Sequence, residues 1–257
     1  MDYKTFIKPF AGGSVKMIAA VQVGILLVIW MLAPTSLFPS PAEVVDSWHK
    51  LAKDQSMLVE LAASSWTIVQ ALTYSSIIAA AFAYLAAINI LKPVTSGVAA
   101  MRFLGFAGIT FMFTMLTSDG SSLKVWLLTF GMLVFQVTNM VAVTNSISQA
   151  EVDYAKTLRL SPFRKVYELL ILGKRHDFLD IIRQNAAIGW VMLSMVEGLV
   201  RSEGGIGSLL ITQSKFLNLS AIVAIQLTIL GYGIVQDYVL GYARYLLCPY
   251  IKYTNVK

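Results

Sequence analysis

Long apolar runs alternate with shorter polar segments along the 257 residues of this chain. An α-helix needs about 20 mainly apolar residues to cross the hydrocarbon core of a membrane. Runs near or above that length cover 15–33, 66–91, 98–117, 124–145, 184–201 and 220–247. The pattern predicts an all-α membrane protein, one domain over 1–257, with about six transmembrane helices.

The polar segment 146–183, between the fourth and fifth runs, is too long for a simple turn. Its central part, 151–172, is basic and helix-forming, with apolar residues at helical spacing: Leu158, Phe163, Val166, Leu169 and Leu170. This pattern is typical of a helix that lies against another protein. The alternative is a basic loop that rests on anionic lipid headgroups.

The composition excludes an ordinary soluble domain, because 57% of the residues are hydrophobic and only 13% are charged. An even number of spans places both termini on one side of the membrane. If that side is the cytoplasm, fifteen of the twenty Lys and Arg residues lie on it. This asymmetry follows the positive-inside rule. The net charge of +6 therefore reflects topology, and no nucleic acid partner is expected.

Ionisable residues within predicted spans are candidates for function, since a charge in a membrane is costly. Glu197 is predicted either to line or gate a path near the external side, or to pair with Arg201 one helical turn away. Asp237 has Arg244 or a neighbouring helix as its predicted partner.

The sequence offers few candidate residues for catalysis or metal binding. His49 and His176 lie in separate loops, and Cys248 is the single cysteine. No metal site, cofactor or catalytic residue is therefore expected, and an intramembrane enzyme is disfavoured. The chain also lacks G-x-x-x-x-G-K-[ST], so ATP hydrolysis would take place on a partner subunit.

Three landmarks occur in a recognisable order. Residues 38–44 read FPSPAEV, residues 153–161 read DYAKTLRLS, and Gly189-Trp190 and Glu197 precede GGIGSL at 204–209. Together they resemble the permease subunit of binding-protein-dependent ABC importers, in the nitrate, sulfonate and taurine group. The resemblance covers about 38–247.

The resemblance implies a type I importer permease-like fold in a bacterial inner membrane, with both termini cytoplasmic. It implies a coupling helix that docks on the ATPase through Asp153, Ala155, Thr157, Leu158, Arg159, Leu160, Ser161 and Phe163. The implied partners are cytoplasmic ABC ATPase subunits, an external solute-binding protein and a second permease copy, identical or different.

The chain departs from the family pattern inside the coupling loop. Arg159 replaces a glycine that normally permits a turn between two short helices. Arginine does not readily adopt that backbone conformation, which puts the geometry of the bend in question. The departure supports an alternative function: a structural or assembly membrane protein with a degenerate loop and no transport of its own.

Overall fold

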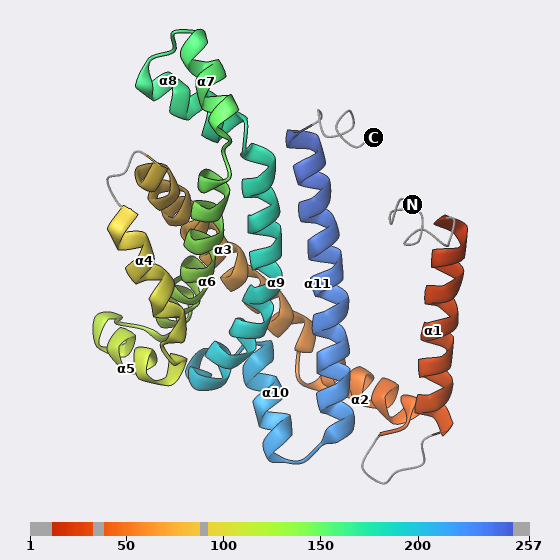
Figure 1. The fold of residues 1–257 in the computed structure, drawn as a ribbon. Helices are drawn as coiled ribbons and strands as arrows, with labels where there is room; N and C mark the ends of the chain where they lie inside the picture. The colour runs from red at the N-terminus through yellow and green to blue at the C-terminus, as the bar shows by residue number, and fades with distance from the viewer. Residues whose placement is uncertain (1–11, 33–38, 88–91, 249–257) are drawn as a thin grey trace.

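The computed structural model describes residues 12–32, 39–87 and 92–248, and within these ranges the chain is helical with no strand. The centre of the bundle is formed by α3 (Met57–Ala87), α6 (Gly120–Asn145), α9 (Arg175–Leu199) and α11 (Leu219–Leu247). Figure 1 shows α6, α9 and α11 side by side, with α3 crossing behind them. The all-helical prediction is confirmed for the described residues.

The two ends of the bundle differ. At one end, here named the loop end, α6 finishes and α9 begins, and the short helices α7 (Gln149–Thr157) and α8 (Pro162–Val166) project beyond the bundle (Figure 1). At the opposite end lie α2 (Pro41–Asp54), α5 (Phe106–Leu116) and α10 (Ile206–Lys215). This end is named the α10 end.

Three described helices are long and apolar enough to cross a membrane: α3, α6 and α11. They correspond to the predicted spans 66–91, 124–145 and 220–247, although 88–91 lie outside the described residues. Helices also form at the predicted spans 15–33 and 184–201, as α1 (Gly12–Leu32) and α9. However, α1 contributes only a shorter apolar stretch, Ala20–Met31, and α9 does not qualify as a span.

The predicted span 98–117 is not one continuous helix. The chain forms α4 (Lys92–Ala100), a 3₁₀ turn at Met101–Phe103 and then α5. The two parts are bent by 114° relative to each other. Gly105 precedes α5 in an extended conformation, with φ −74° and ψ 137°, which breaks the helical path. The described residues therefore hold three candidate spans, or four if the bent pair counts as one.

Small residues let α3 approach α6 closely. The buried face of α3 carries Ala71, Ala79 and Ala83, each 0% exposed. Side chains of this size allow close helix packing in lipid, where no hydrophobic effect drives association. One polar contact joins these two helices: the side-chain amide of Gln136 on α6 donates to Ser76 on α3 at 2.8 Å. A second polar contact joins α9 to α6, where the Asn185 amide donates to the Met132 carbonyl at 3.2 Å.

The amphipathic helix α2 lies against the first turns of α11. Ser40 caps its first turn, with Glu43 reaching back to the Ser40 N–H at 3.1 Å, and Pro41 is its first residue. Ser47 donates to Ser220 at 2.8 Å, and the Trp48 indole donates to Thr228 at 3.1 Å. These bonds attach α2 to the α10 end of the bundle.

Candidate functional site

The loop predicted over 146–183 is shorter than expected and well structured. Because α9 already begins at Arg175, the connection consists of α7, a turn, α8 and a π-helical segment, η3, at Tyr167–Leu172. The first helix is capped reciprocally. The Glu151 N–H donates to the Ser148 hydroxyl at 3.3 Å, and the Ser148 N–H donates to the Glu151 carboxylate at 2.7 Å. Such a capping box stabilises a short exposed helix.

Arg159 forms the turn that the resemblance assigns to glycine. Its φ is +50°, in the left-handed region. The Arg159 N–H donates to the Lys156 carbonyl at 2.9 Å, and the Leu160 N–H donates to the Ala155 carbonyl at 3.4 Å. This pair of bonds is the Schellman motif that ends many helices. The arginine therefore forms the turn itself and bears the conformational strain of the left-handed backbone.

Replacing Arg159 with glycine should stabilise the loop. A non-glycine residue in the left-handed helical region costs on the order of 1 kcal/mol, and glycine does not bear this cost. Arg159→Gly should therefore slow amide hydrogen exchange in α7 by about fivefold. Lys156→Gly is the contrasting control, because this residue is inside α7 and glycine there should speed exchange. Faster exchange in Arg159→Gly would contradict this account of the turn.

The loop is joined firmly to α9. In η3 the Gly173 N–H donates to the Glu168 carbonyl at 3.0 Å, a π-type bond five residues apart. A Cβ at Gly173 would lie 2.6 Å from the Leu169 carbonyl oxygen, so this position requires glycine. Leu170 is 5% exposed, and π-helical turns often occur at functional sites. The loop thus continues into α9 through an ordered, closely packed segment.

Charged residues of the loop pair mainly within it. The Lys156 ammonium lies 2.8 Å from the Asp153 carboxylate, a contact that lowers the pKa of Asp153. The Ser148 N–H and hydroxyl lower the pKa of Glu151, with a smaller contribution from Lys174. Lys174 lies 3.9 Å from Glu151 and so connects the start of α7 with the start of α9. Both carboxylates are therefore ionised near neutral pH.

Three of the predicted coupling residues shape the loop. Ala155 is 2% exposed, Thr157 donates to the Tyr154 carbonyl at 2.7 Å, and the Ser161 hydroxyl accepts from the Arg164 N–H at 3.4 Å. Leu160 is half-buried. The side chain of Phe163 lies outside the described part of the structure.

The remaining predicted residues face outward. Leu158 is 54% exposed, and Asp153 and Arg159 are also exposed. Sequence inspection missed the aromatic part of this surface, which consists of Tyr154 at 67% and Tyr167 at 50% exposure. We name Tyr154, Leu158 and Tyr167 the loop surface. The signal for Tyr154 was available, because it lies one helical turn, four positions, before Leu158.

Glu197 lies at the α10 end and is 1% exposed. Its carboxylate accepts hydrogen bonds from the Ser64 hydroxyl at 2.6 Å and from the Gly207 N–H at 2.8 Å. The Ser64 hydroxyl in turn accepts from the Ile206 N–H at 2.9 Å. These amides form the first turn of α10, whose partial positive charge favours a carboxylate. Glu197 therefore holds α10 against α3 through a buried carboxylate.

The predicted pairing of Glu197 with Arg201 is wrong. The Arg201 guanidinium donates instead to the Gly198 carbonyl at 3.2 Å, and no ion pair between described residues joins it to Glu197. The first turn of α10, which folds back towards α9, supplies a hydrogen-bond donor to Glu197 instead. The spacing of residues within α9 alone could not reveal this partner.

Two further charged residues complete this cluster. Glu60 accepts from the Gly205 N–H at 2.5 Å, and the Lys124 ammonium donates to the Gly204 carbonyl at 2.8 Å. Gly205 has φ +101°, and a Cβ there would lie 2.3 Å from the Glu197 carboxyl carbon. Only glycine allows this approach. We name Glu60, Ser64, Lys124 and Glu197 the α10 anchor.

A second charged cluster joins α9 to α11. Arg183 binds Asp237 in bidentate fashion, with N–O distances of 2.6 and 2.8 Å. Arg244 forms an ion pair with Asp180, which also lies 3.9 Å from Arg183. Of the two predicted partners of Asp237, the neighbouring helix is confirmed, and Arg244 binds elsewhere. We name these four residues the α9–α11 clamp.

The described residues hold no group of three or more His, Cys, Asp or Glu side chains that could bind a metal ion. No family model and no curated protein sequence matches the chain.

Proposed function

We propose that this chain is the transmembrane permease subunit of an ATP-driven ABC importer, and that its loop surface docks on a cytoplasmic ATPase. The observation that carries the proposal is the projecting α7–α8 hairpin, which presents exposed apolar and aromatic side chains on a capped, ordered backbone. A loop that served only to turn the chain would need neither the cap nor the Schellman turn. Aromatic anchors surrounded by charged residues are typical of protein interfaces.

The connection to the bundle supports a role in transmitting motion. A docking element can move the spans only if it shifts with them as one body. Ala155 of α7 and Leu170 of η3 are buried, and Lys174 pairs with Glu151 across the loop. The loop leads directly into α9, which carries residues of both the clamp and the anchor. Displacement of the loop would thus reach α11 and α10.

The orientation follows from the charge bias. The loop end carries seven Lys and Arg residues between 156 and 183, and this concentration favours the cytoplasmic side. The partners would be ATPase subunits on that side, a second permease copy in the membrane, and an external solute-binding protein at the α10 end. The chain would contribute the solute path and no catalytic chemistry of its own.

The Schellman turn also bears on the alternative, an assembly protein with a degenerate loop. That alternative rested on two departures from the family pattern, Arg159 in place of a glycine and Leu172 in place of a proline, and the turn concerns the first of them. Because the loop keeps its turn with arginine, the replacement does not argue against docking. A transport assay in a strain that lacks the chain separates the two functions, since an assembly protein would leave uptake by a fully assembled transporter intact.

The coupling claim is tested with Leu158→Asp in the affinity-tagged full chain, purified from its own membranes. Burying a charge in an apolar interface costs several kcal/mol, so co-purification of the ABC ATPase and its activity should fall by more than tenfold. Leu217→Asp is the matched control. Leu217 is 82% exposed at the opposite end, next to α11. Unchanged co-purification in Leu158→Asp would refute docking through the loop surface.

A further inference from the structure

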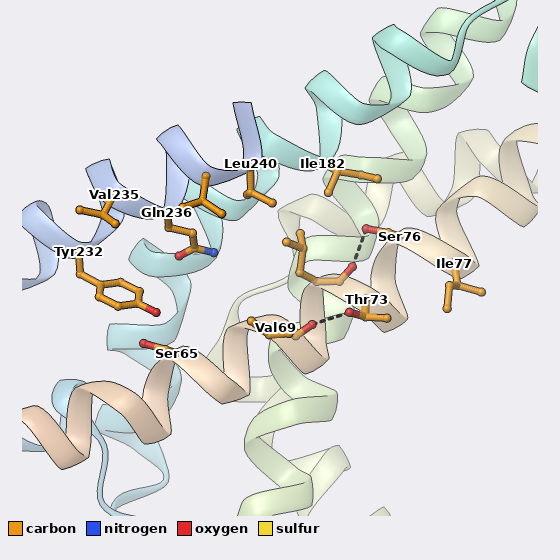
Figure 2. Close-up of a pocket in the computed structure, with 12 residues that line it drawn as sticks. Ser65, Val69, Thr73, Ser76, Ile77, Ile182, Tyr232, Val235, Gln236 and Leu240 are labelled. Atoms are coloured by element: carbon orange, nitrogen blue, oxygen red, sulfur yellow. Dashed lines mark hydrogen bonds between the residues drawn. The ribbon is translucent and has the colours of Figure 1, made fainter. Parts of the chain in front are cut away.

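A groove of about 570 Å³ lies between α3 and α11. Figure 2 shows its two walls, with Ser65, Thr73 and Ser76 on α3 and Tyr232 and Gln236 on α11. The rest of the lining is aliphatic. The volume is within the range of small-molecule sites, which are mostly apolar with a few placed polar groups. We name it the α3–α11 groove.

Among the described residues, none of those that line the groove is charged. A charged ligand would lose its hydration without gaining a counter-ion, which disfavours ionic ligands strongly. The hydroxyls of α3 are already engaged as donors to carbonyls of their own helix: Ser65 to Leu61 at 2.6 Å, Thr73 to Val69 at 2.7 Å and Ser76 to Leu72 at 2.5 Å. The donors left for a ligand therefore come from α11.

Trp190 fixes the orientation of both α11 donors. Its indole N–H donates to the Gln236 side-chain oxygen at 2.6 Å, so the amide nitrogen of Gln236 is left to donate elsewhere. The Tyr232 ring packs edge-on against Trp190, with centroids 5.3 Å apart. Figure 2 shows the Tyr232 hydroxyl and the Gln236 amide directed into the groove. Neither donor forms a hydrogen bond with another described residue.

The depth of these donors restricts the ligand. The midpoints of α3 and α11 are Leu72 and Gly233, both at the level of the groove. At 1.5 Å per residue, Tyr232 and Gln236 lie within about 5 Å of the midpoint of α11. The hydrocarbon core is about 30 Å thick, so both donors lie near mid-depth if α11 spans it symmetrically. Phospholipid ester oxygens lie at the interface and do not reach this level.

We propose that the α3–α11 groove binds an uncharged amphiphile dissolved in the bilayer, with a carbonyl or hydroxyl oxygen of the ligand accepting from Tyr232 and Gln236. The aliphatic wall takes the apolar body of the ligand. In hydrocarbon, where no water competes, such donors favour an oxygen acceptor over a methylene. The site is independent of the proposed transport function and of the loop surface.

The test uses the full chain in phosphatidylcholine nanodiscs with one of two photoactivatable probes, a long-chain ketone carrying a mid-chain diazirine or the matched hydrocarbon. After irradiation, labelled residues are mapped by mass spectrometry. The ketone should label groove residues at least fivefold more than the hydrocarbon, the ratio expected of one net hydrogen bond. Tyr232→Phe with Gln236→Leu should reduce ketone labelling to the hydrocarbon level.

Tyr238→Phe is the matched control, because Tyr238 is 80% exposed on the same helix and outside the groove lining. It should leave labelling unchanged. Tyr232→Phe alone keeps the ring against Trp190 and preserves the test if the double variant does not fold. Equal labelling by both probes would show that the groove only contacts lipid acyl chains and has no preference for an oxygen acceptor. Suppression by aqueous glycerol but not by unlabelled ketone would assign it to a water-borne solute, and either result overturns the proposal.

Discussion

Glu197→Ala should lower the free energy of unfolding by about 3 kcal/mol and release the first turn of α10. The substitution leaves the buried Gly207 N–H without its acceptor and deprives the Ser64 hydroxyl of its carboxylate, while also opening a cavity. Each buried unsatisfied group costs about 1–3 kcal/mol, and the cavity adds to this. Hydrogen exchange at the amides of Gly205, Ile206 and Gly207 measures the release directly, and thermal unfolding in detergent measures the global effect.

Glu197→Gln separates shape from charge. The glutamine oxygen can still accept from Gly207, and its amide can donate to the Ser64 hydroxyl, so its cost should be at most half that of alanine. Met195→Ala is the control on the same helix, since Met195 is 56% exposed and should have little effect. If Glu197→Ala left both the unfolding temperature and the exchange of α10 unchanged, the α10 anchor would have no structural role.

The Arg183–Asp237 pair should show strong coupling in a double-mutant cycle. Asp237 lies about 6 Å along the axis from the midpoint of α11, inside the hydrocarbon core if the helix spans it symmetrically. Removing Arg183 deprives Asp237 of its bidentate partner, and removing Asp237 leaves Arg183 only the more distant Asp180 at 3.9 Å. An unpaired charge in a membrane helix costs about 2.5–3.5 kcal/mol, which sets the upper limit of the loss. Each alanine variant should therefore lose about 2 kcal/mol, and the double variant should lose little more than either single one.

The measurement is unfolding of the full chain in mixed micelles titrated with sodium dodecyl sulfate. Asp237→Asn serves as the control that keeps the shape of the side chain. It should resemble Asp237→Ala, because the charge and not the volume holds Arg183. Additive effects of the two alanine substitutions would show that α9 and α11 are held together without this pair.

Local sequence was sufficient for the helices and their caps. The apolar runs predicted α3, α6 and α11 because an unbroken apolar stretch has few alternatives to a spanning helix. The cap that Ser40 and Glu43 form on α2 is likewise local, since both partners lie within one helical turn. The prediction was wrong at 98–117, where hydropathy alone did not reveal the break before Gly105 and the 114° bend that follows.

The outward surface of the loop was only partly predictable. The spacing of Leu158 and Phe163 suggested an apolar stripe, and Leu158 is indeed exposed. Tyr154 was passed over because the predicted stripe began at Leu158. Whether an apolar side chain on a short helix faces the bundle or points away depends on how α7 packs, and spacing alone does not specify this.

The helices before and after the loop, and the apolar spacing within it, were determined by the sequence itself, because apolar length and helical periodicity act over neighbouring positions. The turn at Arg159 is local as well, since its hydrogen bonds lie within residues 155–160. Only the tertiary structure decided the partners of Glu197 and Asp237. Glu197 binds the first turn of α10, which folds back to it, and Asp237 binds Arg183 on another helix. Each outcome depends on groups brought together by packing, which the order of residues along one helix does not encode.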